Sequence, residues 1–426
     1  MTPVSPLHIA LLGPAATPDF APLGGPAFQD LPQGYVGAPF MATLAAGLLE
    51  RGHRVTVISM SSDLPCDEPA GVSRRTGRLE LLYVPLRKGA WRCNGWRPGH
   101  ILDLFRFERR AMGAALAQVR PDVVHAHWPY EFAWSAIDSG LPHVVTCHDS
   151  PFRVARLYRG WKLGGYRRIK AWMAWHALRR AACVSAVSPY LAQEVAPLCR
   201  SAAQVVPNPV AQPAATTLPM ARTPGTPARV LMVCNGWSAL KNPQAGLNAF
   251  AQVARALPEV ELVLLGHGFS EGGPAQRWCR EAGIEGRMRF VGPASHEEVG
   301  AWMAGSDLLL HPSLEESFGM VVAEALAAGL PVVCGQGSGA VPWVVGEGGR
   351  LVDVTRPDDT AAAMLELLRD PGLRARLGEA GRSGVRARFG VSRVVEAYEE
   401  LYRRALSRGT GHAAWPAGRL GAGAWS

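Results

Sequence analysis

Short apolar runs alternate with helical stretches along this sequence, and the alternation starts afresh about halfway along the chain. This pattern indicates parallel strands joined by crossover helices, the α/β class. The expected strands are residues 9–12, 54–59, 79–83, 123–126, 143–147 and 183–186, then 230–234, 261–265, 288–291, 307–311, 331–334 and 349–352. The expected helices include residues 39–50, 243–256, 274–282, 296–304, 319–328, 358–369, 373–387 and 392–406.

The length and the position of a linker divide the chain. At 426 residues it is too long for one core. Residues 206–227 are rich in Pro, Ala and Thr and are typical of a linker. We therefore predict one domain over residues 1–205, a second over 206–390, a last helix within 391–408, and a disordered Gly/Ala-rich tail over 409–426.

The stretch 311–333 carries the densest chemical information. Glu316 and Glu324, with seven residues between them, surround the expected start of a helix near Ser317. The amides and positive dipole end of a helix N-terminus suit a phosphate, and carboxylates suit sugar and ribose hydroxyls. Alternatively, one acid favours the helix dipole and the other lies on a solvated face.

Those residues resemble the E-x7-E signature of the family 4 glycosyltransferases. Residues 325–333 are similar to the helix, glycine stop and strand of that family, and residues 289–292 and 301–307 precede them with its spacing. The resemblance implies the GT-B fold, in which two Rossmann-like parallel-sheet domains face across a cleft and the last helix packs back on the first domain. It also implies that the first domain binds an acceptor and the second a nucleotide-sugar.

The resemblance also implies roles for residues of the second half. Glu316 would hold sugar hydroxyls and Glu324 the ribose, while amides near Ser317, Phe318 and Gly319 would neutralise the diphosphate. Lys241, after the first strand of the second half, would reach the diphosphate as a point charge. The family's neighbouring arginine is missing, because Gly236 and Trp237 occupy that position. An exposed lysine at a helix start is the alternative for Lys241.

In the first half, histidines follow the ends of two expected strands. His125 and His127, two residues apart, point to the same side. By resemblance His127 would lie against the transferred sugar, whereas His125 is expected to be structural. His148 and Asp149 end the next strand, where turn formation explains them nearly as well. No further ligands at suitable spacing support a metal site.

Several glycines follow expected strand ends, where backbone can approach a diphosphate closely. Gly34 and Gly37 match the position of the family's first loop, with Gly24 and Gly25 as a rival pair. The resemblance places Gly266 and Gly268 beside the base, with backbone near Gly292 and Pro293 contacting it, although a plain strand–helix turn also explains the first two.

Composition limits the class of protein. A hydrophobic content of 48% with 19% charged residues is globular. The first apolar run lacks a preceding basic region, so a strand is expected there rather than a signal peptide, and no run is long enough for a membrane span. Eight cysteines are scattered without a C-x-x-C pair, which favours a reduced, cytoplasmic environment.

The basic charge is confined to one half. Residues 1–205 hold 23 Lys and Arg against 14 Asp and Glu, while residues 206–426 hold 21 of each. Nine basic residues and five Trp or Tyr, without an acid, fall within 151–180. This segment is a solvated helix face, a nucleic-acid contact, for which no module is present, or a contact with the inner face of an anionic membrane, which we favour.

We therefore predict a retaining glycosyltransferase that moves a sugar from a nucleotide-diphosphate donor to a saccharide or lipid-linked acceptor, with no cofactor or metal. A nucleotide-sugar 2-epimerase of the same fold is an alternative, and so is a catalytically inactive membrane-associated protein. Nucleic acid is not an expected partner.

Overall fold

The computed structural model describes residues 5–67, 70–92, 97–158, 160–212 and 227–409. The first half forms an eight-stranded sheet in the order β3-β4-β2-β1-β5-β6-β7-β8. Its strands are parallel except where β3 meets β4. They are β1 (His8–Leu12), β2 (Arg54–Ser61), β3 (Val72–Thr76), β4 (Leu79–Pro85), β5 (Val123–His127), β6 (His143–Cys147), β7 (Cys183–Ala186) and β8 (Gln204–Val205).

Both faces of this sheet are covered, as expected for a parallel sheet. Ile9 and Leu11 of β1 join one apolar cluster, whereas Ala10 and Leu12, on the opposite face, join another. The helices of this half are α1 (Thr17–Gly24), α2 (Phe40–Glu50), α3 (Arg106–Val119), α4 (Glu131–Asp138), α5 (Pro151–Leu157), α6 (Trp161–Arg180) and α7 (Pro189–Val195). Ser188 caps α7, because its hydroxyl accepts from Leu191 N at 3.1 Å.

The second half forms a six-stranded parallel sheet in the order β11-β10-β9-β12-β13-β14. Its strands are β9 (Ala228–Val233), β10 (Val260–Leu265), β11 (Met288–Gly292), β12 (Leu308–His311), β13 (Val332–Gly335) and β14 (Gly349–Val352). The helices around it are α8 (Pro243–Ala256), α9 (Pro274–Glu281), α10 (His296–Ala304), α11 (Met320–Ala327), α12 (Val341–Val345), α13 (Pro357–Arg369) and α14 (Pro371–Phe389).

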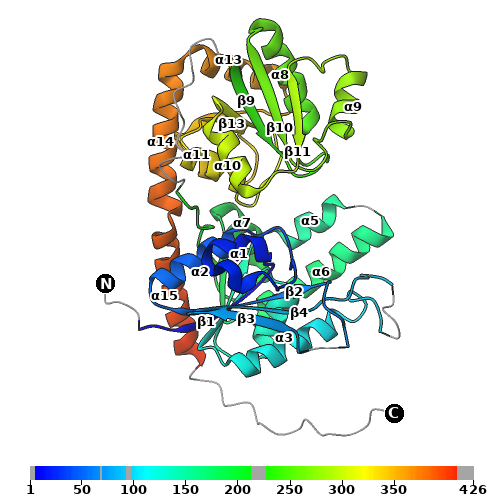
Figure 1. The fold of residues 1–426 in the computed structure, drawn as a ribbon, viewed down its shortest axis with the longest axis vertical. Helices are drawn as coiled ribbons and strands as arrows, with labels where there is room; N and C mark the ends of the chain where they lie inside the picture. Colours follow the sequence, from blue (N-terminus) through cyan, green and yellow to red (C-terminus); the bar gives the residue numbers. More distant parts are fainter. Residues whose placement is uncertain (1–4, 68–69, 93–96, 159, 213–226, 410–426) are drawn as a thin grey trace.

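The last helix joins the two halves. Figure 1 shows α14 running beside the second domain and α15 (Val391–Gly409) continuing along the first. Tyr398 and Tyr402 of α15 are buried in the same cluster as α2. Near the start of α15, Gly390 pairs with Val210, and Val210 N donates to Phe389 O at 2.9 Å. The two chain passages between the domains therefore lie side by side.

Every strand predicted from the sequence is present, each within two residues of its expected bounds. The edge strands β3 and β8 and the helices α1, α3, α4 and α12 were not predicted. The expected helix start near Ser317 is wrong, because α11 begins at Met320 with Gly319 as its cap. The tail prediction is wrong at its first residue, since α15 continues to Gly409; residues 410–426 lie outside the described residues.

The predicted linker is only partly described, since residues 213–226 lie outside the described chain. Within its described part, Val206 and Val210 are buried. Across the described residues, no helix combines the length and apolar character needed to cross a bilayer.

Candidate active site

Lys241 and Glu316 meet directly in the second domain. Lys241 Nζ donates to Glu316 Oε1 at 2.6 Å. The loops that carry them follow β9 and β12 and are bound to each other, because Leu314 N donates to Leu240 O at 2.8 Å. Asn242, with a left-handed backbone, donates from Nδ2 to Pro312 O at 3.2 Å. The geometry of this ion pair is therefore fixed by the backbone of both loops.

His311, at the end of β12, is a third member that was not predicted from the sequence. Its Nε2 lies 3.2 Å from Glu316 Oε1, an ion-pair distance without hydrogen-bond alignment. Burial alone would raise the pKa of Glu316, but His311 and Lys241 outweigh burial and lower this pKa to about 2. Glu316 is therefore a carboxylate at neutral pH, with Lys241 and His311 beside it.

The backbone before α11 differs from the prediction in detail. Gly319 adopts φ 92°, which favours glycine, and caps the helix. The free N–H groups of the first turn therefore begin with Met320 rather than with Ser317. The Phe318 ring is buried against Trp343 and Phe389, so its side chain serves the core.

Glu324, on the second turn of α11, is mostly buried and lies 4.0 Å from His296 Nδ1 of α10. Burial raises the pKa of Glu324, while His296 opposes this rise. The two glutamates of the motif thus differ: Lys241 and His311 lie close to Glu316 and keep it ionised, whereas Glu324 is a desolvated carboxyl with a weak partner. A hydroxyl that donates to Glu324 would meet a group with spare hydrogen-bonding capacity.

The loops after β9, β10 and β11 bring the predicted glycines of the second domain together. Gly236 N donates to His267 O at 3.0 Å, and Gly266 N donates to Gly292 O at 2.7 Å. A Cβ on Gly266 would lie 2.1 Å from Cys234 O, so only glycine fits there. Gly236, Gly268 and Gly292 also have positive φ angles. The carboxyl ends of β9, β10 and β11 therefore carry a strip of backbone with few side chains, the glycine strip, which is made of Gly236, Gly266, Gly268 and Gly292.

Trp237 stands where the resembled family has an arginine. Its ring packs against Phe269 and Trp278, each with centroids 5.9 Å apart. It therefore belongs to an aromatic cluster and supplies no second cation beside Lys241.

His127 and His148 form a pair at the carboxyl ends of β5 and β6. His127 Nδ1 and His148 Nε2 are 2.9 Å apart, and the Phe40 ring stacks on His148 at 4.7 Å. Burial lowers the pKa of His127 to about 3 and lowers that of His148 well below its usual value. His127 is fully buried, and its Nε2 has no hydrogen-bond partner among the described residues. An orphaned ring nitrogen of this kind is uncommon and suits contact with a ligand.

His125 has a partner for each ring nitrogen, and Asp149 has a partner for one carboxylate oxygen. His125 lies 2.9 Å from the Tyr402 hydroxyl and 2.7 Å from Thr146 Oγ1, consistent with a structural histidine. The Tyr130 hydroxyl donates to Asp149 Oδ1 at 2.8 Å, and burial raises the pKa of Asp149. The ring nitrogens of His125 are therefore both in use, whereas only Oδ1 of Asp149 is held, by Tyr130.

Gly34 and Gly37 flank the loop before α2. Tyr35 N donates to Ala15 O at 2.9 Å, and a Cβ on Gly34 would lie 2.3 Å from that same oxygen. Gly34 therefore lets the loop approach the end of β1, whereas Gly37 faces open space. In the rival pair, Gly24 packs tightly against the Phe28 ring, a local turn contact.

The two domains touch beside the Lys241–Glu316 pair. The Ser188 hydroxyl donates to Ser317 O at 2.6 Å, and the Tyr190 hydroxyl donates to Glu315 Oε1 at 2.8 Å. Arg153 of α5 also pairs with Glu315. Met320 packs against the first-domain cluster that contains Phe40. The Lys241–Glu316 pair and the loop before α11 therefore lie close to the domain junction. The contacts of Glu315 were not predicted from the sequence.

Two family models match the chain. The model of Glycosyl transferases group 1 matches residues 222–384, and that of Glycosyltransferase Family 4 matches residues 38–211. This chain belongs to the family 4 glycosyltransferases. The first model covers most of the second domain, and the second model covers most of the first domain. The family predicted from the E-x7-E motif is therefore confirmed.

One relative within this family is the D-inositol 3-phosphate glycosyltransferase of Corynebacterium kroppenstedtii. It is 31% identical over 190 residues, which are 43% of this chain and 42% of the relative. The match thus spans less than half the length of that relative.

Solved structures confirm the predicted GT-B fold. Sucrose-phosphate synthase from Thermosynechococcus elongatus superposes with a TM-score of 0.71 at 19% identity, covering 94% of this chain and 99% of the other. Anabaena HepE, solved in complex with UDP and glucose, superposes with a TM-score of 0.63 at 17% identity, covering 92% and 98%. At these identities the likeness concerns the fold alone.

Proposed function

We propose that this family 4 glycosyltransferase moves a sugar from a nucleotide-diphosphate donor to an acceptor hydroxyl with retained anomeric configuration. The observation that carries the proposal is the Lys241–Glu316 pair, 2.6 Å apart, at the domain junction beside a strip of glycines. The bond from the anomeric carbon to the diphosphate breaks, and the acceptor oxygen bonds to that carbon. The acceptor proton leaves with the diphosphate.

Charge on the departing diphosphate is the main electrostatic problem of this reaction. Lys241 and the amides before and within the first turn of α11 would neutralise it, and each preorganised donor of this type contributes about 3 kcal/mol to the transition state. Glu316, held ionised, would accept hydroxyls of the donor sugar, and Glu324 those of the ribose. In this proposal no metal or cofactor takes part.

The nucleoside would lie along the glycine strip of Gly236, Gly266, Gly268 and Gly292, where backbone can approach a ring closely. The support from a fold relative is that HepE was solved with UDP and glucose. On the first-domain side, the loop around Gly34 and Gly37 would face the donor phosphates. The orphaned Nε2 of His127 would hydrogen-bond a sugar hydroxyl when the donor enters.

We also propose that the α5–α6 surface rests on an anionic membrane at the cytoplasmic face. Trp161, Arg168, Trp172, Trp175 and Arg179 are exposed and recur at helical spacing, so they share one face of α6. Exposed rings combined with cations suit the lipid headgroup region. Not all of the basic stretch contributes, because Lys170 is buried against Glu131 and Arg153 pairs with Glu315.

The test is donor binding followed by turnover. UDP, GDP, ADP, dTDP and their common sugars would be screened by thermal shift, since a ligand at 100 times its Kd stabilises a protein by about 2.7 kcal/mol. With the donor found, Glu316→Gln should lower kcat about a hundredfold or more, because an ionised acceptor in the site becomes neutral. Glu297→Gln, an exposed acid at the start of α10, is the matched control.

Wild-type turnover in Glu316→Gln would exclude the proposed site. Incorporation of solvent deuterium into the donor sugar without an acceptor would instead indicate epimerase chemistry. Activity that disappears in EDTA and returns with a divalent cation would contradict the metal-free part of the proposal.

A further inference from the structure

A cavity of about 410 Å³ lies within the first domain, apart from the Lys241–Glu316 pair. Its walls come from the ends of β2 and β4, the loop of Gly34, the start of α4 and the first turns of α6. Ligands of open α/β sheets bind outside the carboxyl ends of the strands, and a cavity of this volume is of ligand size.

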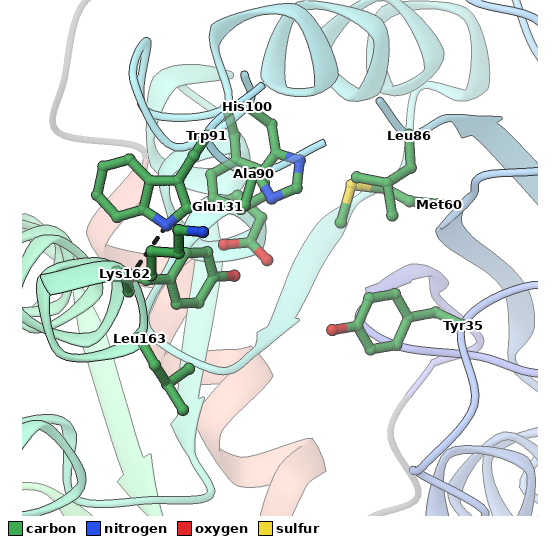
Figure 2. Close-up of a pocket in the computed structure, with 11 residues that line it drawn as sticks. Tyr35, Met60, Leu86, Ala90, Trp91, His100, Glu131, Lys162 and Leu163 are labelled. Carbon is green, nitrogen blue, oxygen red and sulfur yellow. Dashed lines mark hydrogen bonds between the residues drawn. The ribbon is translucent and has the colours of Figure 1, made fainter. Parts of the chain in front are cut away.

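Aromatic rings dominate the lining. Figure 2 shows Trp91 and His100 on one side and Met60 and Leu86 on the other. Phe105 and Tyr166 complete the aromatic wall, and the Phe105 ring lies 4.5 Å from His100. Trp91 is held in place because its Nε1 donates to Lys162 O at 3.1 Å. Flat, fixed rings of this kind suit the C–H faces of a sugar ring.

The polar groups of the cavity are mainly hydrogen-bond acceptors. Figure 2 shows the Glu131 carboxylate and the Tyr35 hydroxyl pointing into the space from opposite sides. His100 Nδ1 must donate to Arg87 O, 3.0 Å away, and burial lowers the pKa of His100, so its Nε2 is an acceptor. The acceptors on Glu131, Tyr35 and His100 suit the hydroxyl protons of a polyol.

The cavity offers little to an anionic ligand. Lys170, the buried cation nearest to Glu131, already donates to that carboxylate and lies over the rings of Phe105 and Tyr130. Lys162 is exposed on the first turn of α6, at the rim. A phosphate inside would therefore meet the Glu131 carboxylate, and among the lining residues only the solvent-exposed Lys162 could balance its charge.

The cavity adjoins the residues that face the proposed donor. Tyr35 lies between Gly34 and Gly37, and Glu131 follows Tyr130, whose hydroxyl donates to Asp149 beside His148. Resting on the proposed function, we infer that this cavity is the acceptor site and that it binds an uncharged hexose unit, either free or as the head of a lipid-linked saccharide. The rim at Leu163 leads to the exposed rings of α6, so both sources can reach it.

The experiment measures hexose binding directly on the full chain. Saturation-transfer NMR would compare the methyl glycosides of glucose, mannose and galactose with the octyl glycosides of the same sugars and with D-inositol 3-phosphate. We expect at least one neutral glycoside to bind. Equal affinity of methyl and octyl forms indicates a free saccharide, whereas a tenfold preference for the octyl form indicates a lipid-linked one.

Two substitutions test the location. Trp91→Ala removes a wall, and Tyr35→Phe removes one hydroxyl from a half-exposed loop residue, so folding should be unaffected in the second. Each should weaken hexose binding at least fivefold while the Kd of the nucleoside diphosphate stays within twofold. Leu102→Ala, an exposed residue of the same loop as His100 and outside the cavity, is the matched control.

The inference is overturned if no neutral hexose binds, if both variants bind as the wild type does, or if inositol phosphate binds tenfold more tightly. Failure of the proposed function has a different signature: no nucleoside diphosphate binds to the wild type, whatever the hexose result.

Discussion

Glu316 on one side of the domain junction and His127 and His148 on the other are all deprotonated at neutral pH, but they differ in charge. Glu316 is kept ionised by Lys241 and His311, whereas His127 and His148 are kept neutral by burial. Each state depends on neighbours rather than on the residue type. The consequence is a site whose charges are set before a substrate arrives.

The neutral histidines predict a loss of stability in acid. Because the pKa of His127 is about 3 in the folded state and its ordinary value is 6.5, the unfolded chain binds a proton that the folded chain refuses. The free energy of unfolding should therefore be highest above pH 6.5 and fall as the pH drops from 6.5 toward 3, by about 1.4 kcal/mol per pH unit for this histidine.

Urea unfolding at pH 7 and pH 5.5 measures this dependence. The stability difference between the wild type and His127→Gln should change by about 1.4 kcal/mol between these two values. His267→Gln, at an exposed position, should leave the pH dependence as it is. Identical pH profiles for the wild type and His127→Gln would show that His127 is not buried in a neutral form.

Spacing in the sequence selected part of the candidate site. Glu316 and Glu324 stand out by the seven residues between them and Lys241 by its place after a strand, and their roles stay predictions. His311 and Glu315 escaped because their importance lies in contacts 3.2 Å and 2.8 Å long that cross between loops or domains. The orphaned nitrogen of His127 is equally invisible until the packing around it is known.

At the scale of elements, hydrophobic periodicity predicted the central strands because both of their faces are buried. The edge strand β3 has an exposed middle, Ser73 to Arg75, so it shows no apolar run. Helix α3 was missed because arginines crowd its first turns and many of its apolar residues are alanines. An element that is buried on one side only has a weaker hydrophobic pattern in its sequence.

Helix α15 is joined to the first domain by one buried carboxylate. Glu399 accepts from Arg51 Nη2 at 2.8 Å and lies 3.0 Å from His53 Nε2. Glu399→Ala should lower the free energy of unfolding by about 2 kcal/mol, because charged hydrogen-bonding groups lose their partner in a buried place. Glu400→Ala, its neighbour with a partly exposed pair to Arg403, should cost about 0.5 kcal/mol or less.

Chemical denaturation of both variants makes this comparison. Equal losses for Glu399→Ala and Glu400→Ala would mean that the buried contact of α15 has no special weight in holding the helix on the first domain.

At the scale of the whole molecule, the net charge of +9 falls on the first domain, together with the exposed rings of α6. We expect the protein to float with liposomes that contain anionic lipid at low salt and to dissociate at high salt, since each basic residue near such a surface contributes about 1 kcal/mol. The double variant Arg168→Glu, Arg179→Glu should bind at least tenfold less.

The matched control carries the same charge change elsewhere. Arg255→Glu with Arg369→Glu reverses two exposed arginines on the second domain. Equal loss of binding in both double variants would attribute the effect to net charge rather than to α6. Binding that ignores salt, or no binding at all, would exclude the membrane contact.

The pairing of Val210 with Gly390 joins the two chain segments about which the second domain would rotate relative to the first. The two chain segments that connect the domains are hydrogen-bonded to each other at this point. They therefore form one pivot rather than two separate connections. A rotation about that pivot would move Lys241 and Glu316 relative to Phe40 and His127, and it would have to break the contacts of Ser317 and Glu315 with the first domain. Such a rotation would open the domain junction without unfolding a strand or a helix.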